Sequence, residues 1–207
     1  MPARKLGATS AFTWNAKASR YIRRSSGQFV PRATIRNALE RALRRGKGEM
    51  RALSLQLQRG EITLASWQLG MADNLRATHT YSAAIARGGM AQITPGDERR
   101  VASLLRDRLR YLNRFAAELE TGKALDGRFI ARAGMYVDAS RTAYQQAQRR
   151  EMIDVQGMSE ERRVRNSAES CDGCIEVESR GWVPIGELPD IGDQECLTNC
   201  QCNDEYR

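Results

Sequence analysis

The residues of this chain best suited to chemistry are its cysteines, which all lie in the last fifth of the sequence. Cys171-Asp-Gly-Cys174 is followed, after 21 residues, by Cys196-Leu-Thr-Asn-Cys200-Gln-Cys202. Two cysteines separated by two residues can bind one metal ion through a tight turn, and Gly173 would relax that turn. A second cluster about 20 residues further on can complete a tetrahedral thiolate site. The spacing therefore predicts a structural zinc site, closed to substrate water.

The number of cysteines exceeds the four places of a tetrahedral site, so the spacing leaves the ligand set open. Cys171, Cys174, Cys196 and Cys200 are the first choice, because Cys200 and Cys202 would form a strained chelate on one ion. Disulfides or free thiols are the alternative, and a particle that leaves the cell could oxidise. Disulfides are rare in reducing cytosol, however, and an odd number of cysteines favours a metal or a leftover thiol.

Carboxylates surround these cysteines in the sequence. They do not favour thiolate formation, and they disfavour contact between this segment and DNA phosphates. The carboxylates are Asp172, Glu176, Glu178 and Glu195.

No other pattern in the sequence suggests catalysis. His79 is the one histidine, it lies far from the cysteines in the chain, and we expect it to be a surface or packed helix residue. Gly46-Lys47-Gly48 and Arg87-Gly88-Gly89 lack the rest of a phosphate-binding loop. We therefore expect a protein that is not an enzyme.

The elements that must position the cysteines are mainly α-helical. Apolar residues recur with helical spacing through an expected helical domain over residues 34–158. The pattern predicts a long-helix bundle with short connections. The expected helices run from Thr34 to about Gly60 with an interruption at Gly46-Lys47-Gly48, from Thr63 to Arg87, from Pro95 to Gly122 with Asp97 as cap, and from Asp126 to about Met152.

The two ends of the chain differ from this helical middle. Residues 1–33 are irregular but carry large apolar side chains, which predicts an extended arm that docks on a partner; a tail packed on its own domain is the alternative. Residues 159–207 predict a small cysteine-rich loop-and-hairpin module, entered through a short charged helix or linker at 160–163. A module with so little apolar content needs a metal or disulfides.

Charge is distributed unevenly along the chain. The formal net charge is +8, yet Glu40 and Glu49 are the only acidic residues before residue 60, whereas acidic residues dominate after residue 150. The basic N-terminal region could meet packaged DNA without sequence preference, or an acidic protein surface. No apolar run is long enough to cross a membrane and no signal peptide is visible, which argues against a secreted or membrane protein.

The cysteine tail carries a family resemblance. Cys171-Asp-Gly-Cys174, Gly181-Trp182 and Asn199-Cys200-Gln-Cys202 resemble the C-terminus of the minor head, or head morphogenesis, proteins of Mu-type tailed phages. Family members often have a histidine just before the final Asn-Cys-x-Cys motif, near the position of Cys196 in this chain. They have an arginine at the position of Gln201. More diffuse similarities lie at Arg20-Tyr21-Ile22-Arg23, Gly27-Gln28-Phe29-Val30, the Trp67 helix, Gly88-Gly89 and Arg132-Ala133-Gly134-Met135-Tyr136.

This resemblance implies a structural virion protein, assembled in the bacterial cytoplasm as a minor capsid or head–tail junction component. Its implied partners are the major capsid, portal or other virion proteins, with multiple copies per particle. The arm would then bury Phe12, Trp14, Tyr21 and Phe29 against capsid or portal protein. The alternative function is a zinc-containing nucleic-acid-binding regulatory protein, against which the acidic tail counts.

Overall fold

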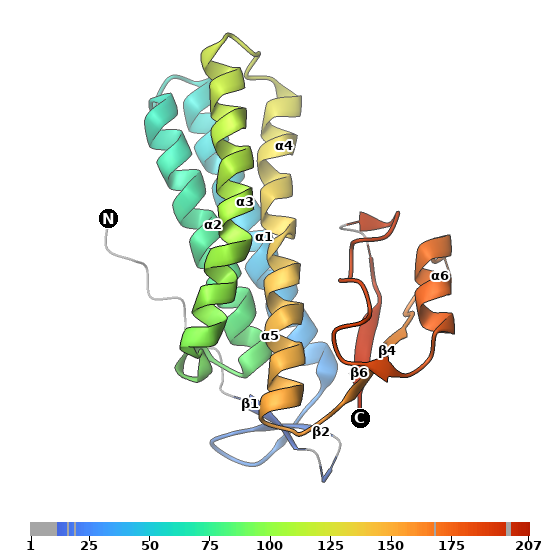
Figure 1. Cartoon of the computed structure of the whole chain (residues 1–207). Coiled ribbons are helices and arrows are strands. Elements are labelled where there is room, and N and C mark those ends of the chain that lie inside the picture. The colour runs from blue at the N-terminus through green and yellow to red at the C-terminus, as the bar shows by residue number, and fades with distance from the viewer. Residues whose placement is uncertain (1–11, 16, 19, 168, 198–199) are drawn as a thin grey trace.

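The computed structural model describes residues 12–15, 17–18, 20–167, 169–197 and 200–207. Long helices form most of the molecule, and two small sheets flank them (Figure 1). The prediction of a mainly α-helical chain, with a long-helix bundle and a small cysteine-rich C-terminal module, is confirmed.

The bundle is built from four rods that run alternately up and down (Figure 1). Its members are α1 (Arg32–Gln58), α2 (Leu64–Arg87), the short 3-10 helix η1 (Met90–Gln92), α3 (Pro95–Glu120), α4 (Gly127–Asp138) and α5 (Ser140–Asp154). The sequence predicted a single helix from Asp126 to about Met152. The structure has two helices there, α4 and α5, which follow each other along one rod, the last of the four. The rod is interrupted at Ala139, where Ser140 Oγ donates to the Val137 carbonyl at 2.6 Å and competes with the helical hydrogen bonds.

Local capping chemistry sets the ends of α2 and α3. Thr63 Oγ1 accepts a hydrogen bond from the Ser66 N–H, and Gly88 ends α2 in the left-handed conformation, with φ 84°. At α3, Thr94 accepts from the Asp97 N–H while Asp97 accepts from the Thr94 N–H. This reciprocal pair is a capping box with Thr94 as the N-cap. The prediction that Asp97 caps α3 is therefore wrong.

The expected interruption of α1 at Gly46-Lys47-Gly48 is wrong, because α1 continues through it. Gly46 is buried where α1 meets α2 and α4, and a Cβ there would lie 2.9 Å from Thr78 Oγ1 and 3.2 Å from Val137 Cγ1. Lys47 forms an ion pair with Asp138 of α4 at 2.7 Å. The glycine therefore permits close helix packing and does not end the helix.

An aromatic cluster holds the bundle together toward the end where α1 passes to α2. Trp67, Phe115 and Phe129 come from α2, α3 and α4, are at most 3% exposed, and have ring centroids 5.5–5.8 Å apart. The Trp67 indole N–H donates to Ser54 Oγ at 3.2 Å, so its one polar group is satisfied in the core.

The N-terminal segment forms a sheet and not an extended arm over its described residues. β1 (Phe12–Asn15), β2 (Arg20–Arg23) and β3 (Phe29–Val30) pair antiparallel in the order β1-β2-β3. Phe12, Tyr21 and Val30 are 5–6% exposed and belong to the core of this chain, and the Phe12 N–H donates to the Gly88 carbonyl at 3.0 Å.

The prediction that Phe12 and Tyr21 bury against a capsid or portal protein is therefore wrong. The three strands cover the end of the bundle, and the alternative of a tail packed on its own domain holds for β1, β2 and β3. Phe29 is 56% exposed. Residues 1–11 and the Trp14 side chain lie outside what the structure describes, so the prediction for Trp14 stays open.

The C-terminal module contains β4 (Glu160–Val164), α6 (Asp172–Ser179), β5 (Val183–Pro184) and β6 (Asn203–Tyr206), with the strands in the order β5-β4-β6. It lies beside the lower half of the bundle in Figure 1. The expected helix or linker at 160–163 is a strand instead. This strand tolerates charged residues because each of them pairs with an opposite charge. Arg162 of β4, for example, forms an ion pair with Glu205, the residue opposite it on β6.

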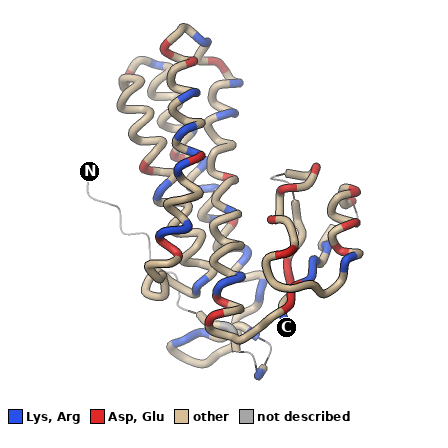
Figure 2. Tube along the Cα trace, in the orientation of Figure 1, with Lys and Arg blue, Asp and Glu red and all other residues tan. Residues whose placement is uncertain are grey.

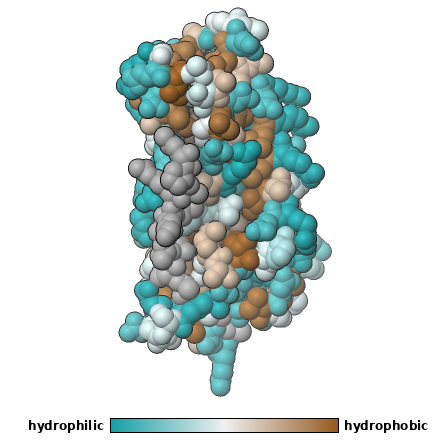
Figure 3. Space-filling view, turned by 90° about the vertical axis from the view of Figure 1, so that its left-hand side faces the viewer, coloured by the Kyte–Doolittle hydropathy of each residue, from teal (hydrophilic) through white to brown (hydrophobic). Residues whose placement is uncertain are grey.

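Charge and hydropathy differ over the surface. Acidic residues are frequent on the module, whereas basic residues are spread along the bundle (Figure 2). Apolar side chains gather toward the upper end of the face in Figure 3, the end from which α2 starts. Within the described residues, no helix is both long enough and apolar enough to cross a membrane.

Candidate metal centre

The cysteine side chains converge at the start of α6. Cys171 stands at the N-cap of α6 and Cys174 lies in its first turn, while Cys196, Cys200 and Cys202 come from the segment that leads into β6. Cys174 is 1% exposed, and its Sγ lies 3.5 Å from Cys196 Sγ and 3.7 Å from Cys200 Sγ. All five thiols are free.

The distances between the sulfur atoms fit a tetrahedral metal–thiolate site. Zn–S bonds of about 2.3 Å with tetrahedral angles place neighbouring sulfurs about 3.8 Å apart. The 3.5 and 3.7 Å separations at Cys174 lie near that value. The donor set is thiol alone, which suits zinc and other metals that prefer soft ligands.

The thiols form two overlapping groups that share Cys174. Cys171, Cys174 and Cys196 lie within 4.8 Å of one another, as do Cys174, Cys200 and Cys202. Cys174 is therefore the one thiol common to both groups. Because Cys200 and Cys202 belong to the same group, their one-residue spacing does not exclude both from one ion, and the ligand set stays open between the two.

Burial changes how readily these thiols ionise. Desolvation raises the pKa of Cys174 and of Cys196, and it raises the pKa of Cys202 to about 11. Desolvation also acts on Cys171, but hydrogen bonds, led by that from the Cys174 backbone N–H, bring its pKa below the ordinary value. Thiolate ligands must lose their protons, so metal binding here would be coupled to proton release.

Gly173 lies where the two cysteine segments pack against each other. Its N–H donates to Glu195 Oε2 at 3.2 Å, and a Cβ at this position would overlap Gln194 Oε1. Gly173 is not among the described glycines with positive φ. The prediction that it relaxes a tight turn is therefore replaced by a different role, which is to let residues 194–195 approach Cys171 and Cys174.

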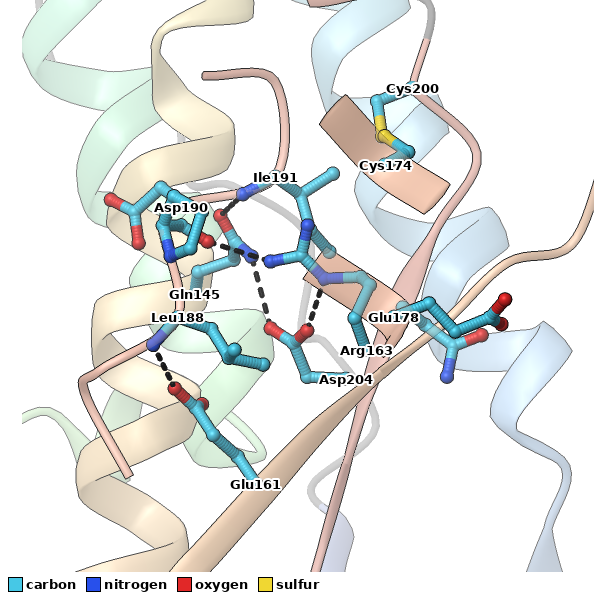
Figure 4. A network of polar contacts seen from close by, with 12 residues as sticks. Gln145, Glu161, Arg163, Cys174, Glu178, Leu188, Asp190, Ile191, Cys200 and Asp204 are labelled. Carbon is cyan, nitrogen blue, oxygen red and sulfur yellow. Dashed lines mark hydrogen bonds and ion pairs between the residues drawn. The ribbon is translucent and has the colours of Figure 1, made fainter. Parts of the chain in front are cut away.

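A buried ion pair fastens the module internally. Arg163 of β4 and Asp204 of β6 face each other with Nε and Oδ1 2.6 Å apart, and their side chains are 0% and 1% exposed (Figure 4). Arg163 also donates to the Pro189 carbonyl at 2.6 Å, and Gln145 of α5 donates to Asp204 at 3.3 Å. Burial opposes the charge of Arg163, but Asp204 raises the pKa of the guanidinium and keeps it protonated.

A second set of ion pairs fastens the module to the bundle. Arg149 of α5 pairs with Glu161 of β4 at 2.9 Å and with Asp190 at 2.6 Å, and it donates to the Leu188 carbonyl. Glu161 is fully buried and also accepts hydrogen bonds from the N–H groups of Gly186 and Leu188, the second of which Figure 4 shows. The sequence carries no signal of this network, because Glu160-Glu161-Arg162-Arg163 is charged throughout and only the structure separates its buried from its exposed positions.

A cleft of about 830 Å³ separates the module from the bundle. The first turns of α1 and part of α5 line one side, and residues 200–206 line the other. Tyr21, Tyr144 and Tyr206 meet at Gln148 in its wall, with hydroxyl-to-amide distances of 3.1, 3.3 and 3.5 Å. Burial raises the pKa of Tyr144 and Tyr206, so these hydroxyls stay protonated.

His79 is a core residue and not part of the cysteine cluster. It is fully buried on α2, its Nδ1 lies 2.9 Å from the Leu75 carbonyl and 3.3 Å from Ser140 Oγ, and its Nε2 has no hydrogen-bond partner within the described part of the chain. Desolvation lowers its pKa to about 4. Of the two alternatives for His79, a surface or a packed helix residue, the packed one is correct.

The chain was compared with protein-family models, curated proteins and solved structures, and none of them gave a significant match.

Proposed function

We propose that this protein is a structural component of a tailed bacteriophage particle, a minor capsid, head morphogenesis or head–tail junction protein that acts by assembling with other virion proteins. Its cysteine-rich module would be held closed by a structural zinc ion. The major capsid and portal proteins are the proposed partners, and the virion is the proposed location.

The observation that carries this proposal is the convergence of thiols from both ends of the Cys171–Cys202 segment on Cys174. Metal sites built from thiolates alone are structural: four protein ligands fill the coordination positions, and no position is open for a substrate water. The Cys171-Asp-Gly-Cys174 and Asn199-Cys200-Gln-Cys202 motifs that build this cluster are also the residues that resemble the phage proteins.

The packing of the rest of the chain agrees with an assembly role. The bundle has a continuous core and the module is tied to α5 by Arg149 and Gln145. Such a body can hold two surfaces at a set separation, as a spacer between virion proteins must.

Mass spectrometry of density-purified particles tests the proposal. We expect peptides of this chain in a constant ratio to the major capsid protein across the particle peak. Presence of the chain in the infected lysate, with absence from the particle peak, would contradict a structural role.

A truncation test needs care, because deleting residues 1–33 would remove Phe12, Tyr21 and Val30 from the core. Removal of residues 1–11 alone leaves every described strand in place and is the better variant. A chain without residues 159–207 tests the module, and circular dichroism on the purified bundle controls for folding.

A further inference from the structure

The strand β6 has one edge without a partner strand among the described residues. In the order β5-β4-β6, β4 occupies one side of β6 and the other side borders the cleft between module and bundle. All seven residues from Cys200 to Tyr206 line that cleft. An exposed strand edge is a template on which an extended chain can add by main-chain hydrogen bonds.

The register shows which main-chain groups of β6 point into the cleft. Glu160 and Arg207 exchange both N–H···O bonds at 3.0 Å, so the hydrogen-bonded pairs continue at every second residue along the ladder. Asp204 and Tyr206 lie between those pairs, and their N–H and C=O groups therefore point away from β4. No main-chain partner for either residue occurs in the described part of the molecule.

The opposite wall of the cleft favours an acidic group. Arg32 and Arg36 of α1 line it, and Arg36 is exposed without an ion-pair partner among the residues that the structure describes. Pro31 at the N-cap of α1 has no side-chain oxygen to satisfy the first N–H groups, and the first turn contains no acidic residue. Arg32 reaches Glu205 at 3.4 Å, but that pair is exposed and an incoming chain could displace it.

A second copy of this chain does not suit the edge. Antiparallel pairing of two β6 strands would bring Asp204 and Glu205 of both copies together, and like charges on neighbouring strands are destabilising. A different chain in extended conformation would avoid this repulsion.

We infer that the open edge of β6 binds an extended segment of another virion protein as an added strand, and that an acidic residue of this segment meets Arg36. This inference rests on the proposed function. Cys200 and Cys202 belong both to the thiol cluster and to the cleft wall, so a metal ion held by them would fix the segment that carries the added strand.

Photo-crosslinking in particles locates the partner segment. A benzoylphenylalanine in place of Asn37 on α1, or of Gln201 on the module, places the crosslinker on either wall of the cleft, and both side chains are exposed. Exposed Glu187, outside the cleft, is the control position. We expect both cleft positions to crosslink to one and the same short segment of one virion protein, and Glu187 not to do so.

Semisynthesis tests strand addition itself. A peptide of residues 202–207 can be ligated at Cys202 to the remainder of the chain, carrying an N-methyl group on the Tyr206 amide. This modification removes an outward N–H and keeps every side chain, and we expect incorporation into particles to fall about tenfold or more. N-methylation at Glu205, whose N–H points to β4, should instead disturb the module in the free protein, as seen by circular dichroism.

A charge reversal tests the acidic contact. Arg36→Glu should weaken the Gln201 crosslink about tenfold, whereas Arg44→Glu, on the same helix but outside the cleft, should leave it unchanged.

The outcomes separate the two proposals. A chain that is incorporated normally with N-methyl Tyr206, or that shows no crosslink from Asn37 and Gln201, would overturn the inference and leave the proposed function standing. Absence of the unmodified chain from particles would overturn both.

Discussion

The buried ion pair between Arg163 and Asp204 should show strong energetic coupling. The two charges lie 2.6 Å apart with side chains at most 1% exposed, so neither can be solvated when its partner is removed. Asp204→Leu or Arg163→Met leaves one buried charge unpaired, and we expect each to cost about 3–5 kcal/mol of unfolding free energy. The module fastened by this pair should be the first part of the molecule to be lost.

The double variant should cost far less than the sum of the single variants. With Arg163→Met and Asp204→Leu together, neither charge of this buried pair remains. The unpaired groups are then the Pro189 carbonyl and the Gln145 amide, for about 2–4 kcal/mol in total. A double-mutant cycle should therefore yield a coupling energy of about 3 kcal/mol or more.

Urea unfolding followed by far-ultraviolet circular dichroism and by tryptophan fluorescence measures these values. Trp182 contributes the signal from the module, where it lies against Arg162 and Arg207. The matched control is Glu205→Gln, which breaks the exposed Arg162 pair on the same two strands and should cost less than about 1 kcal/mol. Effects of Arg163 and Asp204 that add to within about 0.5 kcal/mol would refute the reasoning.

Three further predictions concern the core and the glycines. The fold lowers the pKa of His79 from 6.5 to about 4, so the unfolded chain binds the proton more tightly than the folded one. The contribution of His79 to the free energy of unfolding is therefore complete above pH 6.5 and should decline by about 3 kcal/mol as the pH falls to 4. In urea titrations at each pH, His79→Gln should flatten this slope. Gly88→Ala should lower the Tm and let the Phe12 amide exchange with solvent, because φ is 84° and a Cβ would overlap the Phe12 carbonyl oxygen. Gly48→Ala, on the open surface of α1, should instead stabilise the protein by about 0.5–1 kcal/mol. Equal effects of the two variants would contradict the assigned role of Gly88. Gly173→Ala should weaken metal binding in a competition assay with a chromogenic chelator, and unchanged affinity would count against the packing described for residues 194–195.

The helices were largely predictable from the sequence because their signals are local. Thr63 caps the start of α2 and Gly88 caps its end, as expected for these residue types, and the apolar periodicity marks the buried faces. Gly46 misled because a glycine can either break a helix or let another helix approach, and only the neighbours, Thr78 and Val137, decide between these roles.

The cysteine cluster was predictable in outline because two-residue spacing and a return about 20 residues later impose proximity. The pairing of β4 with β6 was not, since Glu161 and Arg163 lie in a strand only because Arg149 and Asp204 neutralise them from distant parts of the chain. Charged residues carry no strand propensity that would announce such partners. The N-terminal strands were missed for a related reason, because a sheet this small depends on the bundle that it covers.

The metal content of the purified chain tests the central claim most directly. The protein should be purified under reducing conditions, and its metals should be measured by plasma mass spectrometry together with a titration of reactive thiols. We predict one zinc ion per chain, a single readily reactive thiol among the five, and loss of hydrogen-exchange protection in β4 and β6, with the bundle intact, when a chelator removes the metal. A metal-free protein with five reactive thiols, and with β4 and β6 still protected, would contradict the claim.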